Sequence, residues 1–417
     1  MITALEKIKS KIGMNKINAA LSVADQGVVS ATNFGVAFIL ARVLSVEQFG
    51  FYVIMFSIWF FINNLQMGFI NHGLYVLTHS EPSEYKYNMP LIQLFFSAIV
   101  LVVFILASFI YLFSGSDLSL GSMVIYSLSL FFLTLKEYVR NSGLAELQVT
   151  RVTGYDLIFF IGVMGLIVIQ MITGTVTLTS AWMDFALVSL AVIVIDVFGS
   201  RRYSKIDFSK AKSVFHTNFA FSKWTVMTNI IGFANGQVYK YFIAGFLGIT
   251  LVAAVGACEY VIFLVNPILN GLQNYGTAYL SQKQQEGMAQ YRKSYKKYSI
   301  SVLILIGAIL FPVICFPGFF LKLFYSDKYA GYEFLLQVFA ANVMFNVFGR
   351  LYWMRLLVNV LTKYIYRSQF IVMVATIPVL LVLLPLFEIR GFIFYWFFLN
   401  ILTSATAYYY VVKLNVP

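Results

Sequence analysis

Four basic side chains fall inside long apolar stretches of the sequence, namely Lys136, Arg140, Lys223 and Arg350. A charged side chain inside a bilayer costs about 3 kcal/mol even on the most lenient scale, so such residues usually face a polar cavity and act there. Lys136 and Arg140 are four residues apart, which places both cations on one face of a helix. We therefore expect these side chains to bind by charge inside a cavity. For Lys136, Arg140 and Lys223, the alternative is that they extend towards lipid headgroups at the membrane surface.

Two apolar runs carry a polar residue at every fourth position, which places these residues on one helix face. The two stripes are Asn266, Asn270 and Asn274, and Asn342, Asn346 and Arg350. Polar helix faces suit a wide, water-filled cavity. The alternative is that the amides and Arg350 join helices to one another.

Three further ionisable residues, Asp25, Lys240 and Glu259, are candidates for ion coupling or gating. Lys240 and Glu259 lie at similar estimated depths on consecutive predicted helices. We expect them to pair when the cavity is closed, with Glu259 free to take a proton in the other state. Asp25 lies near the cationic residues on the cytoplasmic side.

The composition is that of a membrane protein. Of the 417 residues, 60% are hydrophobic and 11% are charged, and the mean hydropathy is +0.82. The apolar runs are about 20 residues or longer, as required for helices that cross about 30 Å of hydrocarbon. The sequence therefore predicts twelve transmembrane helices at 17–42, 49–77, 87–113, 119–141, 154–173, 178–199, 214–247, 251–281, 298–324, 330–357, 363–387 and 389–412.

Weak internal similarity at an offset of about half the chain predicts two six-helix lobes. Segment 33–77 matches segment 236–282, with Phe49-Gly50 aligned with Val255-Gly256. We expect an N-terminal lobe at 1–200, a basic cytoplasmic linker at 201–213 and a C-terminal lobe at 214–417. Most of the 29 Lys and Arg residues fall in alternate loops, which places both termini in the cytoplasm.

The remaining features exclude several functional classes. The net charge of +12 follows from the basic cytoplasmic loops, so it does not indicate nucleic acid binding. Cys258 and Cys315 lack the spacing of a disulfide or metal site. The sequence also lacks a Gly-rich nucleotide-binding loop and any loop long enough for a soluble domain. We therefore expect neither a cofactor nor an enzymatic activity.

Two motifs stand out, Arg42-x-Leu44-x5-Gly50-x-Tyr52 with the following run to Gly68, and 239–248 followed by Gly256. They resemble the lipid-linked O-antigen flippases (Wzx type) of the multidrug, oligosaccharidyl-lipid and polysaccharide exporter (MOP) superfamily, which has a MATE-like fold. Members of that family often have an acid just before the basic residue of the seventh helix, where this chain has Tyr239.

The resemblance implies a protein that moves an undecaprenyl-diphosphate-linked oligosaccharide, such as an O-antigen or capsule repeat unit, to the outer leaflet of the bacterial inner membrane. Two lobes would rock around a cationic cavity, with Lys136, Arg140, Lys223 and Arg350 binding the diphosphate. Besides this glycan and the membrane lipids, a polysaccharide polymerase and a chain-length regulator are candidate partners. No nucleic acid partner is implied.

Three other classes fit less well. A MATE-like exporter of drug-like solutes would favour acids in its cavity, whereas cations outnumber acids among the embedded residues identified above. A polysaccharide polymerase would have a large outer loop, which the sequence lacks. A sugar porter of the major facilitator type would have a Gly-Arg-rich loop at 79–86, where this chain has none.

Overall fold

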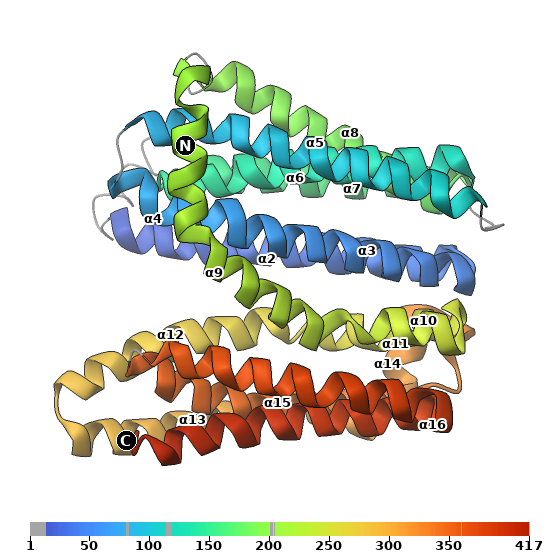
Figure 1. Ribbon diagram of the computed structural model, residues 1–417. Helices are drawn as coiled ribbons and strands as arrows, with labels where there is room; N and C mark the ends of the chain where they lie inside the picture. Colours follow the sequence, from blue (N-terminus) through green and yellow to red (C-terminus); the bar gives the residue numbers. More distant parts are fainter. Residues whose placement is uncertain are drawn as a thin grey trace, which may run out of the picture. The chain divides into compact units, whose positions relative to one another are not determined.

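The computed structural model describes residues 14–80, 83–113, 119–200, 203, 205–359 and 361–416. Within these ranges the chain is helical almost throughout and has no β-strand, so the predicted all-α fold is confirmed (Figure 1). The chain forms two compact units. The first contains Phe56–Ile230 and the described residues up to Val36, and the second contains Ala37–Met55 and the described residues from Ile231 onwards.

The first unit is built mainly from long helices. In chain order they are α2 (Met14–Val43), α3 (Val46–Gln66), the π-helix η1 (Met67–Asn71), α4 (His72–Ser80), α5 (Ser83–Phe113), α6 (Leu120–Ala145), α7 (Val149–Thr173), α8 (Leu178–Gly199), the 3-10 helix η3 (Phe208–Lys210) and α9 (Ala211–Gln237). Helix α6 packs against both α5 and α8. The last turns of α2, the first turns of α3 and the end of α9 belong to the second unit.

Local sequence signals determine where α7 ends and where α8 begins in the first unit. The Thr177 side chain accepts the backbone N–H of Ser180, and the Ser180 hydroxyl accepts the backbone N–H of Thr177, which together start α8. Gly174 ends α7 with a φ of 70°, a left-handed conformation that glycine adopts without strain. These local signals position α7 and α8, which carry three of the buried carboxylates described below.

The predicted helix at 49–77 is interrupted by η1, where the regular hydrogen-bond pattern of the backbone changes. Side chains of α9 donate to three nearby carbonyls: Asn229 Nδ2 to Asn64 at 2.9 Å, Thr225 Oγ1 to Gly68 at 2.9 Å and Asn218 Nδ2 to Phe69 at 2.6 Å. Gly68 permits this close packing, because a Cβ there would lie 2.9 Å from the Cα of Val226. Helix α9 is therefore hydrogen-bonded to the irregular part of α3 and η1.

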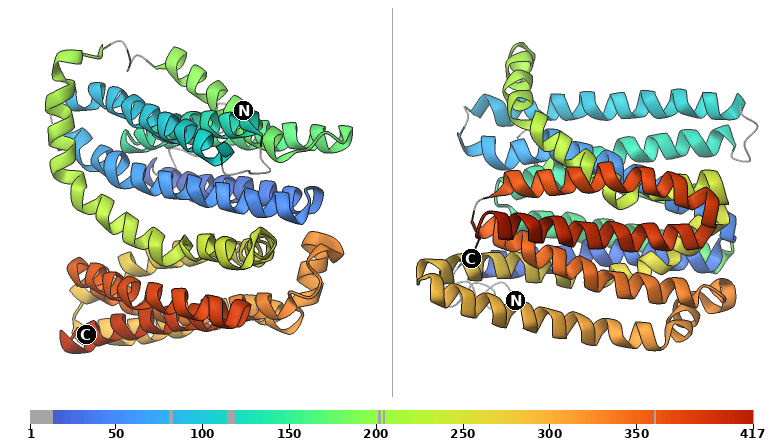
Figure 2. Two further views of the ribbon diagram at one scale, coloured as in Figure 1. Left: turned by 45° about the vertical axis from the view of Figure 1, so that its right-hand side comes forward. Right: turned by 60° about the horizontal axis from the view of Figure 1, so that its bottom comes forward.

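The second unit contains the remaining helices: α10 (Tyr239–Leu247), α11 (Ile249–Phe263), α12 (Asn266–Gln285), α13 (Met288–Cys315), α14 (Pro317–Tyr325), the 3-10 helix η4 (Ser326–Tyr329), α15 (Glu333–Val358) and α16 (Thr362–Lys413). Helix α16 contains two arms that fold back on each other at Glu388, which has a φ of 50° (Figure 2). Gly391 allows the turn, since a Cβ at this position would overlap the carbonyl oxygen of Leu383.

The corner between α2 and α3 lies in the second unit and is held there by reciprocal contacts. Arg42 donates from Nε and Nη2 to the carbonyls of Phe324 and Leu323, both at 2.8 Å, at the end of α14. Lys328 in turn donates to three carbonyls at the end of α2, at 2.5 to 3.0 Å. Helix C-termini carry partial negative charge and unpaired carbonyls. Arg42 therefore stabilises the end of α14, and Lys328 stabilises the end of α2.

Two aligned glycines support the same corner. A Cβ at Gly50 would overlap the carbonyl oxygen of Ile249, and a Cβ at Gly256 would lie 2.5 Å from the Val53 side chain. The sequence repeat thus includes two positions at which α3 and α11 approach closely.

Within the described residues, nine helices are long and apolar enough to span a membrane, or up to ten if α11 and α12 are counted together as one bent span. The 52-residue α16 is counted once among them, although its two arms match two of the predicted ranges. Twelve membrane crossings, the assignment of lobes to 1–200 and 214–417, and the linker at 201–213 stay predictions.

Candidate functional site

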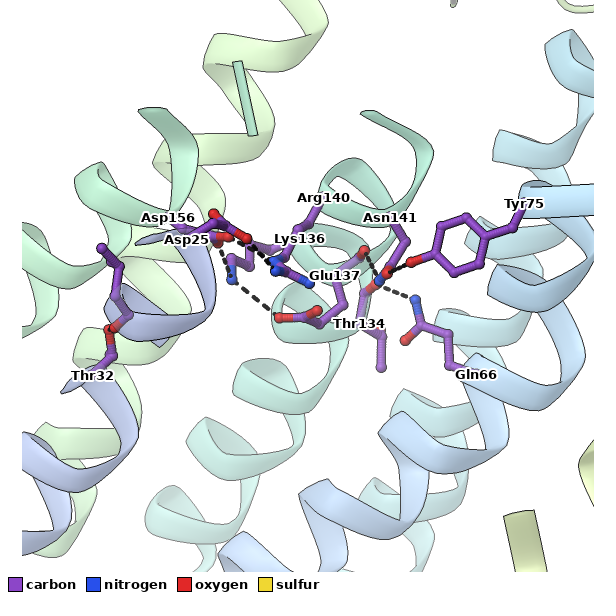
Figure 3. A network of polar contacts seen from close by, with 11 residues as sticks. Asp25, Thr32, Gln66, Tyr75, Thr134, Lys136, Glu137, Arg140, Asn141 and Asp156 are labelled. Atoms are coloured by element: carbon purple, nitrogen blue, oxygen red, sulfur yellow. Dashed lines mark hydrogen bonds and ion pairs between the residues drawn. The ribbon is translucent and has the colours of Figure 1, made fainter. Parts of the chain in front are cut away.

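A buried cluster of charged side chains lies in the first unit, formed by α2, α6 and α7 (Figure 3). Arg140 contacts Asp25 through Nη2 at 2.5 Å and Asp156 through Nε at 2.6 Å. The ammonium of Lys136 lies 3.1 Å from an oxygen of Asp156 and 3.1 Å from an oxygen of Glu137. Lys136 is 3% exposed and Arg140 is 8% exposed.

This cluster changes what Lys136 and Arg140 can do. They share a helix face, as predicted, but they meet three carboxylates, so the five groups together carry one negative charge when all are ionised. Lys136 is also 4.4 Å from the centre of the Phe159 ring. A diphosphate could therefore bind these two cations only if it displaced a carboxylate or if a carboxylate took up a proton.

An uncharged network lies beside the charged cluster and joins α3, α5 and α6. Gln66 donates to Gln93 at 3.1 Å and to the carbonyl of Thr134 at 2.9 Å. Gln93 donates to Ser97 at 2.8 Å, and the hydroxyls of Ser97 and Thr134 are 2.7 Å apart. All four side chains are fully buried. These amides and hydroxyls join helices to one another.

Counted by solvent burial, acids outnumber cations among the described residues, whereas the seven embedded residues identified from the sequence comprise five cations and two acids. Among the described residues, the buried acids are Asp25, Asp156, Asp184, Asp196 and Glu259, whereas the buried cations are Lys136, Arg140 and Lys240. The Asp184 carboxylate accepts the Gln170 amide at 3.0 Å, and Asp196 pairs with Arg151 at 2.7 Å. The sequence contained the signal for these acids, because Asp184 and Asp196 fall inside the predicted run 178–199.

Arg350 has a different environment in the second unit. Its Nε donates to Asn346 at 2.9 Å, and its Nη1 donates to Asn270 at 3.1 Å and to Gln273 at 3.2 Å. These partners are neutral amide oxygens. Within the described part of the chain, no carboxylate forms an ion pair with Arg350. The half-buried guanidinium therefore keeps an uncompensated positive charge.

The Arg350 side chain lines a small pocket, with a cavity volume of about 20 Å³, bounded by α12, α13 and α15. The two predicted polar stripes meet at Arg350, because Asn270 belongs to the stripe on α12 and Asn346 to the stripe on α15. Asn346 also donates to Asn400 at 3.2 Å. The amides thus hold the guanidinium by hydrogen bonds that do not neutralise it.

The other members of the two stripes do not bind Arg350 in the same way. Asn342 is 1% exposed, and its amide atoms have no hydrogen-bond partner among the described residues. Asn266 is half-buried at the start of α12. The side chain of Asn274 lies outside the described residues.

Lys240 and Glu259 form the expected ion pair in the second unit. The Lys240 ammonium is 2.6 Å from Glu259 Oε2 and donates to Gln237 at 2.7 Å. The Tyr239 hydroxyl donates to Glu259 Oε1 at 2.9 Å. Position 239 holds a tyrosine rather than an acid. The carboxylate that contacts Lys240 comes instead from Glu259 of α11. Its predicted role in ion coupling stays a prediction.

Lys223 lies apart from the charged cluster of the first unit. It is exposed on α9, and no ion pair of this side chain occurs among the described residues. The structure therefore groups Lys136 with Arg140 and Asp25, but not with Lys223. Arg350, Lys240 and Glu259 belong to the other unit.

A family model described as polysaccharide biosynthesis protein matches residues 39–333, which is most of the chain. No curated relative matches the chain in sequence.

Solved structures of transporters share the fold. A MATE family multidrug resistance transporter of the MOP superfamily, in an inward-facing conformation, is 13% identical with a TM-score of 0.69, over 93% of this chain and 94% of that chain. The lipid II flippase MurJ, in an inward closed conformation, is 13% identical with a TM-score of 0.73, over 95% and 87%. A MOP superfamily transporter from Pyrococcus furiosus is 9% identical with a TM-score of 0.63, over 95% and 94%. The structure is thus that of a multi-pass membrane protein with the MOP fold.

Proposed function

The chain belongs to the polysaccharide biosynthesis protein family, and we propose that it is a flippase for a lipid-linked glycan. Its substrate is an undecaprenyl-diphosphate-linked oligosaccharide, such as an O-antigen or capsule repeat unit. The protein moves this substrate from the inner to the outer leaflet of the bacterial inner membrane by alternating access. The family match and the MOP fold shared with the lipid II flippase MurJ support the class of function.

The environment of Arg350 carries the proposal about the substrate. A cation surrounded by amide oxygens, without a carboxylate partner, favours an anion as its missing neighbour. A guanidinium can donate two parallel hydrogen bonds to phosphate oxygens. The amides of Asn270, Gln273 and Asn346 orient the side chain before the substrate arrives. We therefore assign the diphosphate group to Arg350.

The charged cluster of the first unit supports a second, conditional site. Arg140 holds Asp25 with Nη2 and Asp156 with Nε. Protonation of Asp25 would remove one negative charge and release Nη2 for a phosphate oxygen, while Asp156 keeps the side chain in place. In this proposal Asp25 couples proton uptake to anion binding at Arg140 and Lys136. Exposed Lys223 is a further candidate contact for the diphosphate.

The test is complementation of a flippase-null strain, with membrane abundance of each variant measured in parallel. We expect Arg350→Gln to lower surface delivery of the glycan about 10- to 100-fold, which corresponds to the loss of hydrogen bonds to a charged group. Arg350→Lys should retain part of the activity, because the charge survives while the two-pronged geometry is lost.

Arg390→Gln is the matched control, since Arg390 is exposed in the second unit and the substitution is the same. It should leave delivery unchanged. Normal delivery by Arg350→Gln at normal abundance would contradict the assignment of the diphosphate to Arg350. For the conditional site, Asp25→Asn should abolish the response of transport to an imposed pH gradient, and an unchanged response would exclude Asp25.

A second candidate function is favoured by the five buried acids, which outnumber the buried cations in the described part of the chain. A MATE-like exporter of a cationic, drug-like solute would need such carboxylates. Efflux of a cationic dye from cells that express the protein, lost in Asp25→Asn and unaffected in Arg350→Gln, would support this alternative. The flippase proposal expects no dye efflux.

We also propose that both termini face the cytoplasm. Reporter fusions at Thr175, at Asp327 and at Ser116, which lies outside the described residues, should then report an outer location, and fusions at Lys205 and Arg292 an inner location. Two or more inversions would refute this orientation.

A further inference from the structure

Helix α13 begins with an amphipathic segment that has a basic outer face. Tyr291 and Ser294 point inwards and are 0% and 5% exposed. Tyr291 packs in a cluster with residues of α12 and α15. The opposite face carries four exposed cations, Arg292, Lys293, Lys296 and Lys297. Their spacing forms two adjacent pairs one helical turn apart, so the four side chains occupy one continuous surface.

The same exposed face becomes apolar one turn further along the helix. Ile300, Ile304 and Phe311 are 47%, 66% and 65% exposed. Exposed apolar residues of this kind on a membrane-spanning helix face lipid. Lys297 and Ile300 are separated by about 4.5 Å along the helix axis. The four cations therefore lie where the lipid-facing surface meets the headgroup region.

These four cations lack carboxylate partners in the part of the chain that the structure describes. The first turn of α13 contains no acidic residue. The acid that precedes the helix, Glu286, is bound to Lys283 at 2.7 Å. The basic face thus keeps its charge, since none of the described carboxylates neutralises it.

This face is separate from the Arg350 pocket. That pocket is lined by Tyr298 and Val302 of α13, whereas Arg292, Lys293, Lys296 and Lys297 are on the exposed side of the helix. A ligand bound to the basic face would contact the surrounding lipid rather than the pocket. The inference is therefore independent of the proposed transport substrate.

We propose that Arg292, Lys293, Lys296 and Lys297 form a binding site for the headgroups of anionic phospholipids, such as phosphatidylglycerol, in the leaflet at this end of α13. The cations attract the phosphodiester groups, and the apolar face beyond them contacts the acyl chains of the same lipids. Clusters of basic residues directly beside a membrane-spanning segment bind anionic lipids in this way. Each Lys or Arg in such a cluster contributes about fivefold to lipid affinity.

The test is lipid titration of the purified full-length protein in detergent, followed by native mass spectrometry. A variant with Arg292→Gln, Lys293→Gln, Lys296→Gln and Lys297→Gln should bind phosphatidylglycerol more weakly, by about fivefold for each cation removed. Its affinity for phosphatidylcholine should not change. A variant with Arg292→Lys, Lys293→Arg, Lys296→Arg and Lys297→Arg should bind phosphatidylglycerol like the wild type.

The double variant Lys322→Gln and Arg390→Gln removes exposed cations elsewhere and should bind phosphatidylglycerol normally. Wild-type affinity in the four-Gln variant would overturn the proposal. Equal loss in the charge-preserving variant would also overturn it, because shape rather than charge would then determine binding. If glycerol phosphate competes as strongly as the intact lipid, the face binds soluble phosphate and the lipid site is refuted.

Discussion

Removing one partner of the Lys240–Glu259 pair should destabilise the protein strongly. Both residues are 4% exposed, and their charged atoms are 2.6 Å apart. Lys240→Met would leave the Glu259 carboxylate buried with the Tyr239 hydroxyl as its remaining partner in the described structure. An uncompensated buried charge of this kind costs about 3–5 kcal/mol. Glu259→Gln should cost a similar amount, because it leaves the ammonium with Gln237.

The double variant Lys240→Met with Glu259→Gln should lose much less than the sum of the two single changes. It contains no buried charge at this position, and the amide oxygen introduced by Glu259→Gln can still accept the Tyr239 hydroxyl. The remaining loss is that of about one hydrogen bond to a charged group, about 1–3 kcal/mol. The two residues should therefore show a coupling energy of several kcal/mol in a double-mutant cycle.

The cycle is measured by reversible unfolding in mixed micelles. Single variants that each lose less than about 1 kcal/mol would refute the reasoning, since the pair would then be solvated rather than buried. A double variant that loses the full sum would show that the two charges act independently. Transport assays on the double variant then test the coupling role, because a structural pair predicts an unchanged pH response.

Three further substitutions test other contacts by thermal unfolding. Arg140→Met should cost about 3–5 kcal/mol because it leaves two buried carboxylates without their guanidinium, and adding Asp25→Asn should recover part of this loss. Lys328→Met should cost about 1.5–3 kcal/mol because three carbonyls at the end of α2 lose a charged donor, whereas the control Lys322→Met, with a side chain 73% exposed, should cause no measurable change. Gly50→Ala should cost about 1–3 kcal/mol because the new methyl group meets a backbone carbonyl of α11. Unchanged unfolding in Arg140→Met, Lys328→Met or Gly50→Ala would contradict the contact concerned.

The sequence predicted features that depend on local periodicity. The two polar stripes were visible because an amide at every fourth position stands out in an apolar helix, and the structure places Asn270 and Asn346 on the same guanidinium. The presence of long helices was also predictable, since lipid requires long apolar runs whose backbone groups are satisfied internally, but the predicted ranges 251–281 and 298–324 are each divided between two helices.

The interruptions within the predicted helices depend on tertiary contacts. The π-helix η1 follows no proline, and its neighbouring carbonyls are bound by Asn218 and Thr225 of α9, about 150 residues away in sequence. The hydrophobic pattern of 49–77 contains no information about these donors. For this reason the sequence predicted one long helix at 49–77 where the structure has α3, η1 and α4.

The charge state of a buried site is also a tertiary property. Arg140 and Arg350 look alike in the sequence, because each is a cation in an apolar run with polar residues one turn away. In the structure, Arg140 meets acids from α2 and α7, whereas Arg350 meets only amides among its described hydrogen-bond partners. The same residue type thus gives a centre compensated by carboxylates at Arg140 and an uncompensated centre at Arg350. Because the acids at Arg140 come from other helices, their pairing follows from helix packing rather than from spacing along the chain. A charge embedded in a membrane helix therefore identifies a candidate site, while the acids brought to it by neighbouring helices decide when it can bind.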